Sequence, residues 1–386
     1  MLDSLLIKNF RSLADFEVAK LGRVNLIVGK NNSGKSSVLE ALRIYAGNGQ
    51  RELLDSISAE HDERYRVKET ERAEPDAPLP FQDFFTGRNF PVDDDTAIQI
   101  GSALTPDDVL RVQHVFLAEE REPVIDEVGE TSFRVRRRIV PKTQLHSEAG
   151  ELRQALQITK AERRYPPFFL DSGYSRLRPQ VFDATNSIPC SVIPTQFISA
   201  DELADEWDKI ALIEYAEVVK QAMRIIAPEF ENLYFVRNDD VRPSVRTNFQ
   251  RSAKVKLSDV PRPVPLNSLG DGLLRVLQLA LKLFPAKGGF LLIDEFENGL
   301  HYSVQEKIWA LLFEMAERLD IQVFATTHSW DCIESFTKVA VARKDVDGVL
   351  FRMGRSVRTS DNGRIIATVF DENALQNITQ TDVEVR

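Results

Sequence analysis

Two apolar runs near the N-terminus have the pattern of β-strands. They cover residues 3–10 and 23–28, and the second run (RVNLIV) is continuous and ends in a glycine-rich turn. A continuous apolar run of this length is typical of a strand that is buried on both faces of an α/β sheet. Residues 35–46 follow with apolar side chains at helical spacing. The pattern therefore predicts a strand, a turn and a helix in that order.

The same alternation returns in the C-terminal half. Apolar runs at 289–293 and 321–326 predict buried strands, whereas 270–284 and 304–318 predict helices. Strands that alternate with helices imply a largely parallel sheet. The last 40 residues predict a strand, a turn, a second strand and a short helix.

The middle of the chain has a different pattern. Residues 50–95 are rich in charge and proline and predict an exposed segment. Short alternating runs between 95 and 200, ending with SVIPTQFIS, predict an antiparallel sheet arm. Residues 201–227 predict one amphipathic helix, with Asp201 as its N-cap and Pro228 as its end. The stretch that follows predicts two or three further strands.

The composition is that of an ordinary globular chain and excludes several classes of protein. The 386 residues include 49 basic and 59 acidic ones, a net charge of −10, and 43% are hydrophobic, so a disordered chain is excluded. No apolar run reaches the ~18 residues that span a bilayer, so we expect no membrane segment. The chain begins without the features of a secretory signal and has only two cysteines, which predicts a cytoplasmic protein. The acidic balance argues against coating of nucleic acid but leaves a local basic groove open.

A phosphate-binding motif stands between the strand at 23–28 and the helix that follows it. Residues 29–36 (GKNNSGKS) match G-x-x-x-x-G-K-[ST] at every position. Glycines let backbone N–H groups curl around a phosphate that a Cβ would obstruct, and the start of a helix attracts an anion. Lys35 would reach the β- and γ-phosphates, and the Ser36 hydroxyl would ligate Mg²⁺. We therefore expect ATP with Mg²⁺ to bind at Gly29, Asn31, Asn32, Ser33, Gly34, Lys35, Ser36 and Ser37.

An acidic pair follows the strand predicted at 289–293. A carboxylate at the tip of a strand can hold Mg²⁺, and we assign that role to Asp294. Glu295, one residue further, can polarise the water that attacks the γ-phosphate, which makes it a candidate catalytic base. Lys35 and Asp294 are 259 positions apart, so a large insertion divides the two halves of one site.

Further motifs flank the acidic pair. Ser268, Gly270 and Gly272 are small residues at the predicted start of a helix, which is a second anion site. Residues 297–301 (ENGLH) come directly after the pair, and His328 follows the next predicted strand. The position of His328 favours a catalytic contact with the γ-phosphate.

The order of these motifs resembles the ATP-binding-cassette (ABC) ATPase heads of the SMC/RecF group. It is most similar to the OLD family (overcoming lysogenization defect) and to related AAA-type ATPases of bacterial defence systems. The resemblance covers the N-terminal 46 residues and about 196–386. It implies an α/β fold: an ABC-type, P-loop NTPase head with a mainly parallel sheet, an antiparallel β subdomain and an insertion arm. By the resemblance, Ser268 to Gly272 replaces the LSGGQ signature, 297–301 corresponds to the D-loop and His328 to the switch histidine.

The same resemblance implies a division of the chain and a mode of assembly. Residues 1–48 and 231–386 would form the head, 49–200 the arm and 201–230 a helical lobe. Two copies would pair head to head, each offering its signature to the ATP held by the other. ATP would then hold the homodimer together, and its hydrolysis would release the two heads.

Full-length OLD proteins carry a C-terminal Toprim nuclease. This chain ends 58 residues after His328, so we expect no Toprim domain and a separate nuclease-like effector in antiphage defence. Asp345 and Asp347 resemble a Toprim D-x-D pair, but we expect a turn there.

Several assignments stay open. Arg11 would contact phosphate or adenine, as similar arginines do in the resembling heads, or it would have a surface role. Gln82 and Gln196 are both candidates for a Q-loop glutamine. Basic residues within 134–142 and 237–262 would line a DNA groove or form solvated strand faces. A DNA groove would favour the alternative of a RecF/SMC-like DNA-binding ATPase in DNA repair.

Overall fold

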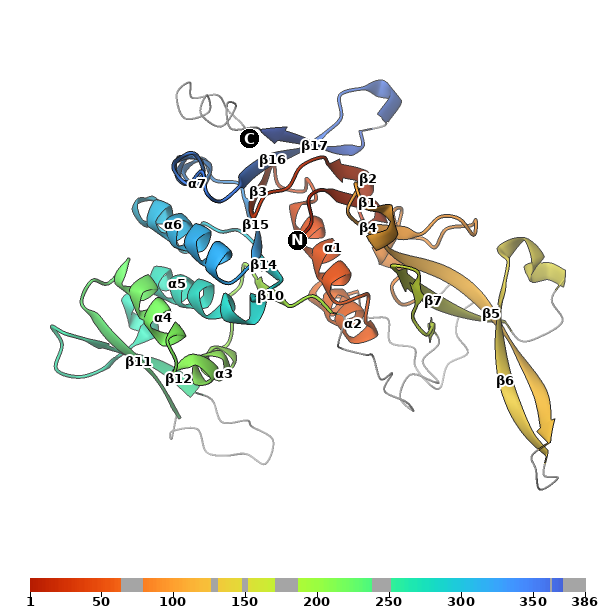
Figure 1. Cartoon of the computed structure of the whole chain (residues 1–386), viewed down its shortest axis with the longest axis horizontal. Coiled ribbons are helices and arrows are strands. Elements are labelled where there is room, and N and C mark those ends of the chain that lie inside the picture. The colour runs from red at the N-terminus through yellow and green to blue at the C-terminus, as the bar shows by residue number, and fades with distance from the viewer. Residues whose placement is uncertain are drawn as a thin grey trace.

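A sheet of six described strands forms the centre of the molecule (Figure 1). The computed structural model describes residues 1–63, 79–125, 131–147, 152–170, 187–237, 251–361 and 363–370. In spatial order the strands are β10 (Cys190–Ile193), β14 (Phe290–Ile293), β15 (Gln322–Thr327), β3 (Val24–Gly29), β16 (Gly348–Arg355) and β17 (Ile365–Phe370). All neighbouring strands in this order are parallel except β16 and β17, which confirms the prediction of a largely parallel sheet.

Both faces of this central sheet are buried, which explains the continuous apolar runs in the sequence. Every residue of β3 and β14 is buried. Because side chains alternate along a strand, Leu291 and Ile293 join one hydrophobic core, and Phe290 and Leu292 join the other. A strand with one solvated face would instead need a polar residue at every second position.

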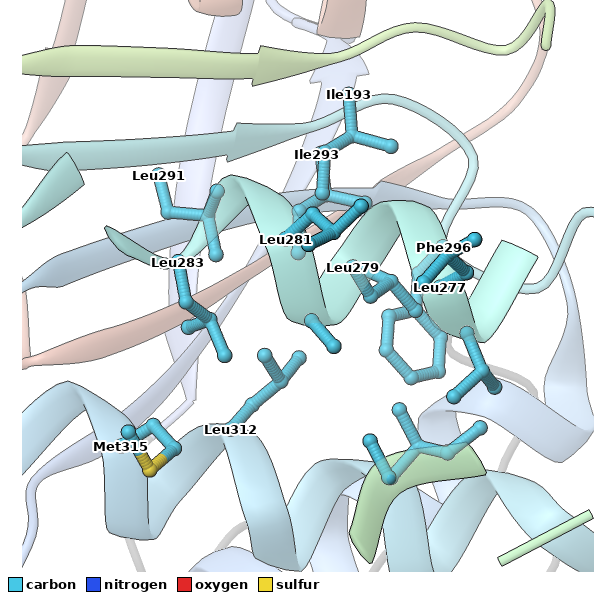
Figure 2. Packing of buried hydrophobic residues seen from close by; sticks show 14 of the residues in the cluster. Ile193, Leu277, Leu279, Leu281, Leu283, Leu291, Ile293, Phe296, Leu312 and Met315 are labelled. Carbon is cyan, nitrogen blue, oxygen red and sulfur yellow. The ribbon is translucent and has the colours of Figure 1, made fainter. Parts of the chain in front are cut away.

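Helices cover the two faces of the central sheet. On one side lie α5 (Asp271–Lys282), α6 (Tyr302–Arg318) and α7 (Trp330–Ala342), and on the other lie α1 (Lys35–Ala46) and α2 (Arg51–Glu60) (Figure 1). Figure 2 shows the leucines of α5 between Leu291 and Ile293 of β14 and Leu312 and Met315 of α6. Burying one such side chain contributes about 1.5–3 kcal/mol, so α5 is held firmly between sheet and helix.

A second sheet is antiparallel and joins strands from the predicted arm to two strands from the N-terminal segment assigned to the head. Its strands run in the order β2 (Leu13–Val18), β1 (Leu5–Phe10), β4 (Ile98–Gly101), β5 (Leu110–Ile125), β7 (Leu152–Lys160) and β8 (Arg163–Arg164), with β6 (Thr131–Val140) on β5 and β9 (Phe168–Phe169) on β7. The described pairings in this sheet are all antiparallel. The pairing of β5 with β7 ends at Ala118, so the rest of β5 forms with β6 a two-stranded ribbon that projects from the body (Figure 1).

The predicted single helix over 201–227 is wrong in one respect, because the chain forms two helices. These are α3 (Ala200–Ile210) and α4 (Tyr215–Arg224). They pack on the strands β12 (Arg251–Leu257) and β11 (Phe230–Arg237), respectively, and both contact α5. One straight helix of that length would extend about 40 Å and could not fold back over these elements. A short strand, β13 (Val264–Pro265), completes this third sheet.

The predicted N-cap of that helix is also wrong. The Ser199 hydroxyl accepts a hydrogen bond from the backbone N–H of Glu202 at 3.2 Å, which is the geometry of an N-cap. The Asp201 carboxylate instead accepts a bond from the backbone N–H of Arg251 at 2.6 Å, so it fastens α3 to β12.

Other segments differ from the sequence prediction. Part of the segment predicted to be exposed is folded, since α2 starts at Arg51 and the side chains of Phe81, Phe84 and Phe85 are buried. The run SVIPTQFIS contributes β10 to the parallel sheet and not to the arm, because β10 pairs with β14. The apolar residues 339–342 (VAVA), whose pattern also predicts the start of a strand, end α7 instead. The short helix predicted at the end of the chain lies outside the described residues.

Short 3₁₀ turns join these elements: η1 (Gln82–Phe84), η2 (Pro106–Asp108), η3 (Lys142–Ser147), η5 (Leu266–Leu269), η6 (Phe284–Ala286) and η7 (Thr359–Asp361). None of the helices in the described part of the chain combines the length and apolar character that crossing a bilayer requires.

Candidate functional site

Strand register brings the predicted site residues to one edge of the central sheet. In a parallel sheet, the segments that follow the strands all emerge at the carboxyl edge, where α/β proteins bind ligands. β15 lies between β14 and β3. Ile293 pairs with Ala325, and Thr327 pairs with Val28. The acidic pair, His328 and the glycine loop are therefore neighbours although they are far apart in sequence.

The glycine loop between β3 and α1 is packed so tightly that side chains would not fit at two positions. A Cβ on Gly29 would lie 2.7 Å from the carbonyl oxygen of Met353. Gly34 has φ +88°, which residues with a side chain rarely adopt, and a Cβ added there would lie 3.1 Å from the side chain of Leu13. Asn32, in the same loop, also has positive φ (62°). This backbone has the compact, glycine-dependent shape that anion-binding loops require.

One polar side chain of the loop has no partner, and a second donates to carbonyls of the loop itself. The Oγ of Ser33 is buried and has no hydrogen-bond partner. The Lys35 ammonium donates to the loop carbonyls of Gly29 (2.8 Å) and Lys30 (3.1 Å). Burial lowers the pKa of Lys35, and the carboxylates across the site oppose this. An anion at the loop would replace these contacts of Lys35 with neutral carbonyls by contacts in which both partners are charged.

The residues assigned to Mg²⁺ lie side by side. The Ser36 hydroxyl is 3.4 Å from each carboxylate oxygen of Asp294. This spacing is compatible with two oxygens that share one octahedral ion whose bonds are about 2.1 Å long. The hydroxyls of Thr195 (3.1 Å) and Thr326 (2.7 Å) donate to the two oxygens of Asp294 and fix its orientation. The donor set therefore fits Mg²⁺, which binds one or two carboxylates together with substrate phosphates.

The sequence did not single out the two threonines. Thr326 comes from the end of β15 and Thr195 follows β10, so only the strand order places them against Asp294. The hydroxyl of Thr326 also accepts a hydrogen bond from the backbone N–H of Glu295 at 2.8 Å. One side chain thus positions both members of the acidic pair.

The candidate catalytic base lies beside the predicted switch histidine. The Glu295 carboxylate is 3.9 Å from Nδ1 of His328, and both side chains are partly exposed. His328 is closer to Glu297, whose carboxylate is 3.2 Å from Nδ1 and also accepts a hydrogen bond from the His328 backbone N–H at 3.0 Å. Sequence reasoning placed Glu297 in the D-loop but did not predict that it holds His328.

The glycine turn of the signature segment packs on the D-loop. Gly270 has φ +93° and is the N-cap residue directly before α5, and the Ser268 hydroxyl donates to the carbonyl of Pro265 at 2.7 Å. A Cβ on Gly272 would lie only 3.0 Å from the carbonyl oxygen of Gly299. The start of α5 therefore lies next to the segment that follows the acidic pair.

Arg11 is already engaged by acidic side chains. Its guanidinium pairs with Glu40 (2.6 Å) and Glu63 (2.8 Å) and lies over the rings of Phe10 and Phe84. Burial would lower the pKa of Arg11, but its two carboxylate partners outweigh this and raise it. A phosphate contact would have to break these ion pairs, so the structure favours a structural role.

The two glutamine candidates are in different environments. Gln82 is held in a local turn, where its amide donates to the carbonyl of Arg88 and to Asn89. Gln196 is exposed and follows Thr195, the residue that contacts Asp294. The structure therefore favours Gln196 as the glutamine next to the nucleotide site.

The basic clusters are largely balanced by acids. On the ribbon, Arg137 pairs with Glu119 at 3.1 Å and Arg138 with Glu120 at 3.2 Å. This supports solvated strand faces over a DNA groove. In the second cluster Arg251 pairs with Asp208 at 2.7 Å, whereas Arg242 and Arg246 lie outside the described residues.

The D-x-D pair lies in a turn, as predicted. Residues 343–347 connect α7 to β16. Asp345 pairs with Arg343 at 2.8 Å, and Asp347 lies 3.9 Å from Lys20.

The fold and this edge of the sheet define the class of the protein, an α/β P-loop nucleotide hydrolase. Residues 24–331 match the family described as "AAA domain, putative AbiEii toxin, Type IV TA system", and the chain belongs to that family. Membership of this AAA family, together with the glycine loop and the acidic pair, identifies the chain as an ATP-hydrolysing enzyme.

Named relatives extend the comparison. An ATP/GTP phosphatase of Helicobacter pylori is 25% identical over 363 residues, which cover 89% of this chain and 90% of that protein. An OLD nuclease of Thermus scotoductus is 24% identical over 363 residues, 90% of this chain but only 63% of the nuclease. Among solved structures, an Smc head bound to the C-winged helix domain of ScpA has a TM-score of 0.47 at 14% identity, covering 97% of this chain and 99% of that one.

Proposed function

We propose that the chain binds Mg·ATP on the loop from Gly29 to Ser37 and hydrolyses it at the carboxyl edge of the central sheet. Glu295 is the general base, and His328 contacts the γ-phosphate. The observation that carries this proposal is the convergence of Lys35, Ser36 and the acidic pair at that edge, with Ser36 3.4 Å from Asp294.

Each residue contributes a defined step. The Lys35 ammonium neutralises charge on the β- and γ-phosphates, and the loop N–H groups fix their position. Glu295 accepts the proton of the attacking water, and His328 stabilises charge that develops on the γ-phosphate. Mg²⁺, when bound at Ser36 and Asp294, supplies positive charge that neutralises the phosphate oxygens.

We infer that the active form is a homodimer in which ATP lies between the Lys35 loop of one copy and the Ser268 turn of the other. Gly270 and Gly272 of that turn present helix N–H groups that suit an anion. Support comes from the packing of this turn against Gly299 of the D-loop, four residues after Glu295. Binding of ATP would close the dimer, and hydrolysis would release it.

The biological role that we propose is control of an effector. One relative is named OLD nuclease, and the alignment covers 63% of that protein. A separate nuclease-like protein would act as the effector of an ATP-dependent switch in antiphage defence. The alternative, direct DNA binding in repair, has less support because Arg137 and Arg138 are already paired.

Mixing two inactive variants tests the composite site. Lys35→Ala removes the phosphate contact and Ser268→Arg blocks the signature turn, so each alone should be inactive. Random exchange of subunits in an equal mixture produces heterodimers with one intact site, which should restore about a quarter of the wild-type phosphate release for a two-fold symmetric dimer. No recovery in verified heterodimers would overturn the sharing of sites between copies.

The effector and the DNA alternative need separate tests. Affinity purification of the native protein from its own cells should retain a nuclease-like protein whose binding differs between Glu295→Gln and Lys35→Ala. ATP-dependent binding to a DNA duplex that weakens steeply with salt would instead favour the repair ATPase.

A further inference from the structure

Arg275 is a fully buried arginine on α5, with no exposed surface. Its guanidinium donates to three backbone carbonyls, those of Pro194 (2.7 Å), Asp294 (2.7 Å) and Glu295 (2.8 Å). Burial lowers the pKa of Arg275 to about 10, so the side chain still carries its charge at neutral pH. A buried charge is costly unless it is hydrogen-bonded, and both terminal nitrogens of Arg275 are bonded to these carbonyls, whereas its Nε is buried without a partner.

The three carbonyls belong to the segments that build the ATP site. Asp294 and Glu295 follow β14, and Pro194 follows β10 and precedes Thr195, whose hydroxyl contacts Asp294. One planar guanidinium therefore links the ends of two adjacent strands. Lysine could not reproduce this, because its ammonium is a point charge without the rigid fork of five donors.

Glu295 has a backbone conformation that needs support. Its φ is +47°, in the left-handed region that non-glycine residues adopt rarely and at a cost of order 1 kcal/mol or more. Its N–H donates to the hydroxyl of Thr326 at 2.8 Å, and its carbonyl accepts from Arg275 at 2.8 Å. Both peptide groups of Glu295 are thus fixed, which sets the direction in which its side chain leaves the backbone.

The signature turn lies at the N-terminal end of α5, close to Arg275. Gly270 and Arg275 are five positions apart, which is about 7.5 Å along a helix. The leucines that follow on α5 are buried in the main core (Figure 2), so the helix responds as a rigid body. A shift of the turn would therefore move the guanidinium that holds Glu295.

We propose that Arg275 is a positioning residue that sets the backbone of Glu295 and couples it to the signature turn. Engagement of the turn by the nucleotide of a second copy would, through Arg275, complete the catalytic geometry in the copy that carries the turn. This inference rests on the proposed function, because it assigns Glu295 as the base. A purely structural arginine would stabilise the fold without a specific effect on turnover.

The test is Arg275→Lys, which keeps the charge and loses the fork. We expect kcat to fall at least about tenfold, since small misplacements of a catalytic group are costly, while the dissociation constant of a fluorescent ATP analogue stays within about threefold. In the double variant with Glu295→Gln, the residual rate should match that of Glu295→Gln alone, because both changes act on one group. Arg153→Lys is the matched control, since Arg153 is nearly buried (9% exposed) in the arm, and it should keep wild-type kcat.

Rates are normalised to the amount of nucleotide-binding protein, so partial unfolding lowers the active fraction and not kcat. If Arg275→Lys does not fold, Arg275→Gln, which keeps a two-donor amide, is measured in the same way. The role of Arg275 is overturned by any of three results. These are an unchanged kcat, a fall in kcat that is matched by an equal loss of nucleotide affinity, and full additivity of the effects on kcat with Glu295→Gln. Normal turnover by Glu295→Gln itself would instead overturn the proposed function.

Discussion

The carboxylate of Glu297 holds His328 at two points. One of its oxygens accepts a hydrogen bond from the His328 backbone N–H at 3.0 Å and lies 3.2 Å from Nδ1 of the same residue. Because Glu297 contacts the Nδ1 side of the ring, Nε2 is the ring nitrogen left to face a phosphate. The D-loop and the strand end of β15 are joined by this pair.

Removing that carboxylate should misplace the histidine. We expect Glu297→Ala to lower kcat by about 10- to 100-fold, the usual effect of losing a group that orients a functional histidine. Glu297→Gln keeps an acceptor oxygen and should lose less. Steady-state kinetics with Glu314→Ala, an exposed residue on α6, as control would measure this. Wild-type kcat in Glu297→Ala would show that His328 does not depend on Glu297.

Lys35→Ala should weaken nucleotide binding. The ammonium now contacts the carbonyls of Gly29 and Lys30, and a phosphate would replace these contacts. A hydrogen bond to a charged group contributes about 1.5–3 kcal/mol, so affinity should fall roughly 10- to 150-fold. Titration with a fluorescent ATP analogue measures this. Lys30→Ala, a change to an exposed side chain of the same loop, is the control. Equal affinities for wild type and Lys35→Ala would contradict the cradle assignment.

Glu295→Gln should separate binding from hydrolysis. The amide cannot accept the proton of water, so kcat should fall about 10²- to 10⁴-fold while ATP still binds. ATP-bound dimer should then accumulate, which light scattering with and without ATP would detect. A variant that turns over normally removes Glu295 from catalysis. One that stays monomeric with bound ATP counts against the nucleotide-closed dimer.

His61 should make stability depend on pH. Its hydrogen bond to Glu40, at 2.7 Å, raises the pKa of His61, and burial opposes the shift. A raised folded-state pKa stabilises the protein fully below the unfolded value of 6.5, and the contribution is lost as pH rises through the folded-state pKa. The imidazole is 40% exposed, so the effect should stay below about 1 kcal/mol.

Urea unfolding of wild type and His61→Gln measures this contribution. The difference in free energy of unfolding should be larger at about pH 5.5 than at about pH 8.5. His146→Gln, a change to an exposed histidine in η3, is measured in parallel as the control. A difference that is constant with pH would mean that the contact with Glu40 does not raise the pKa of His61.

Local chemistry explains why much of the fold and site could be predicted. Strands buried on both faces leave continuous apolar runs, and α1 occupies the residues that apolar spacing predicted, Lys35–Ala46. The phosphate loop is recognisable because its requirements are local. Gly34 is needed for a positive φ and Lys35 for its charge, and both lie within a few residues of each other. The division of 201–227 into two helices was not predictable, because no glycine or proline interrupts it and the break serves packing on two strands.

The sequence by itself determined which residue types could bind a triphosphate and that they follow buried strands. Only the tertiary structure decided which residues hold them: Thr195 and Thr326 on Asp294, Glu297 on His328, and Arg275 on Glu295. The physical reason is that strand order, not sequence distance, sets these contacts. The acceptors of Arg275 are moreover backbone carbonyls, which every residue has, so they leave no trace in the sequence.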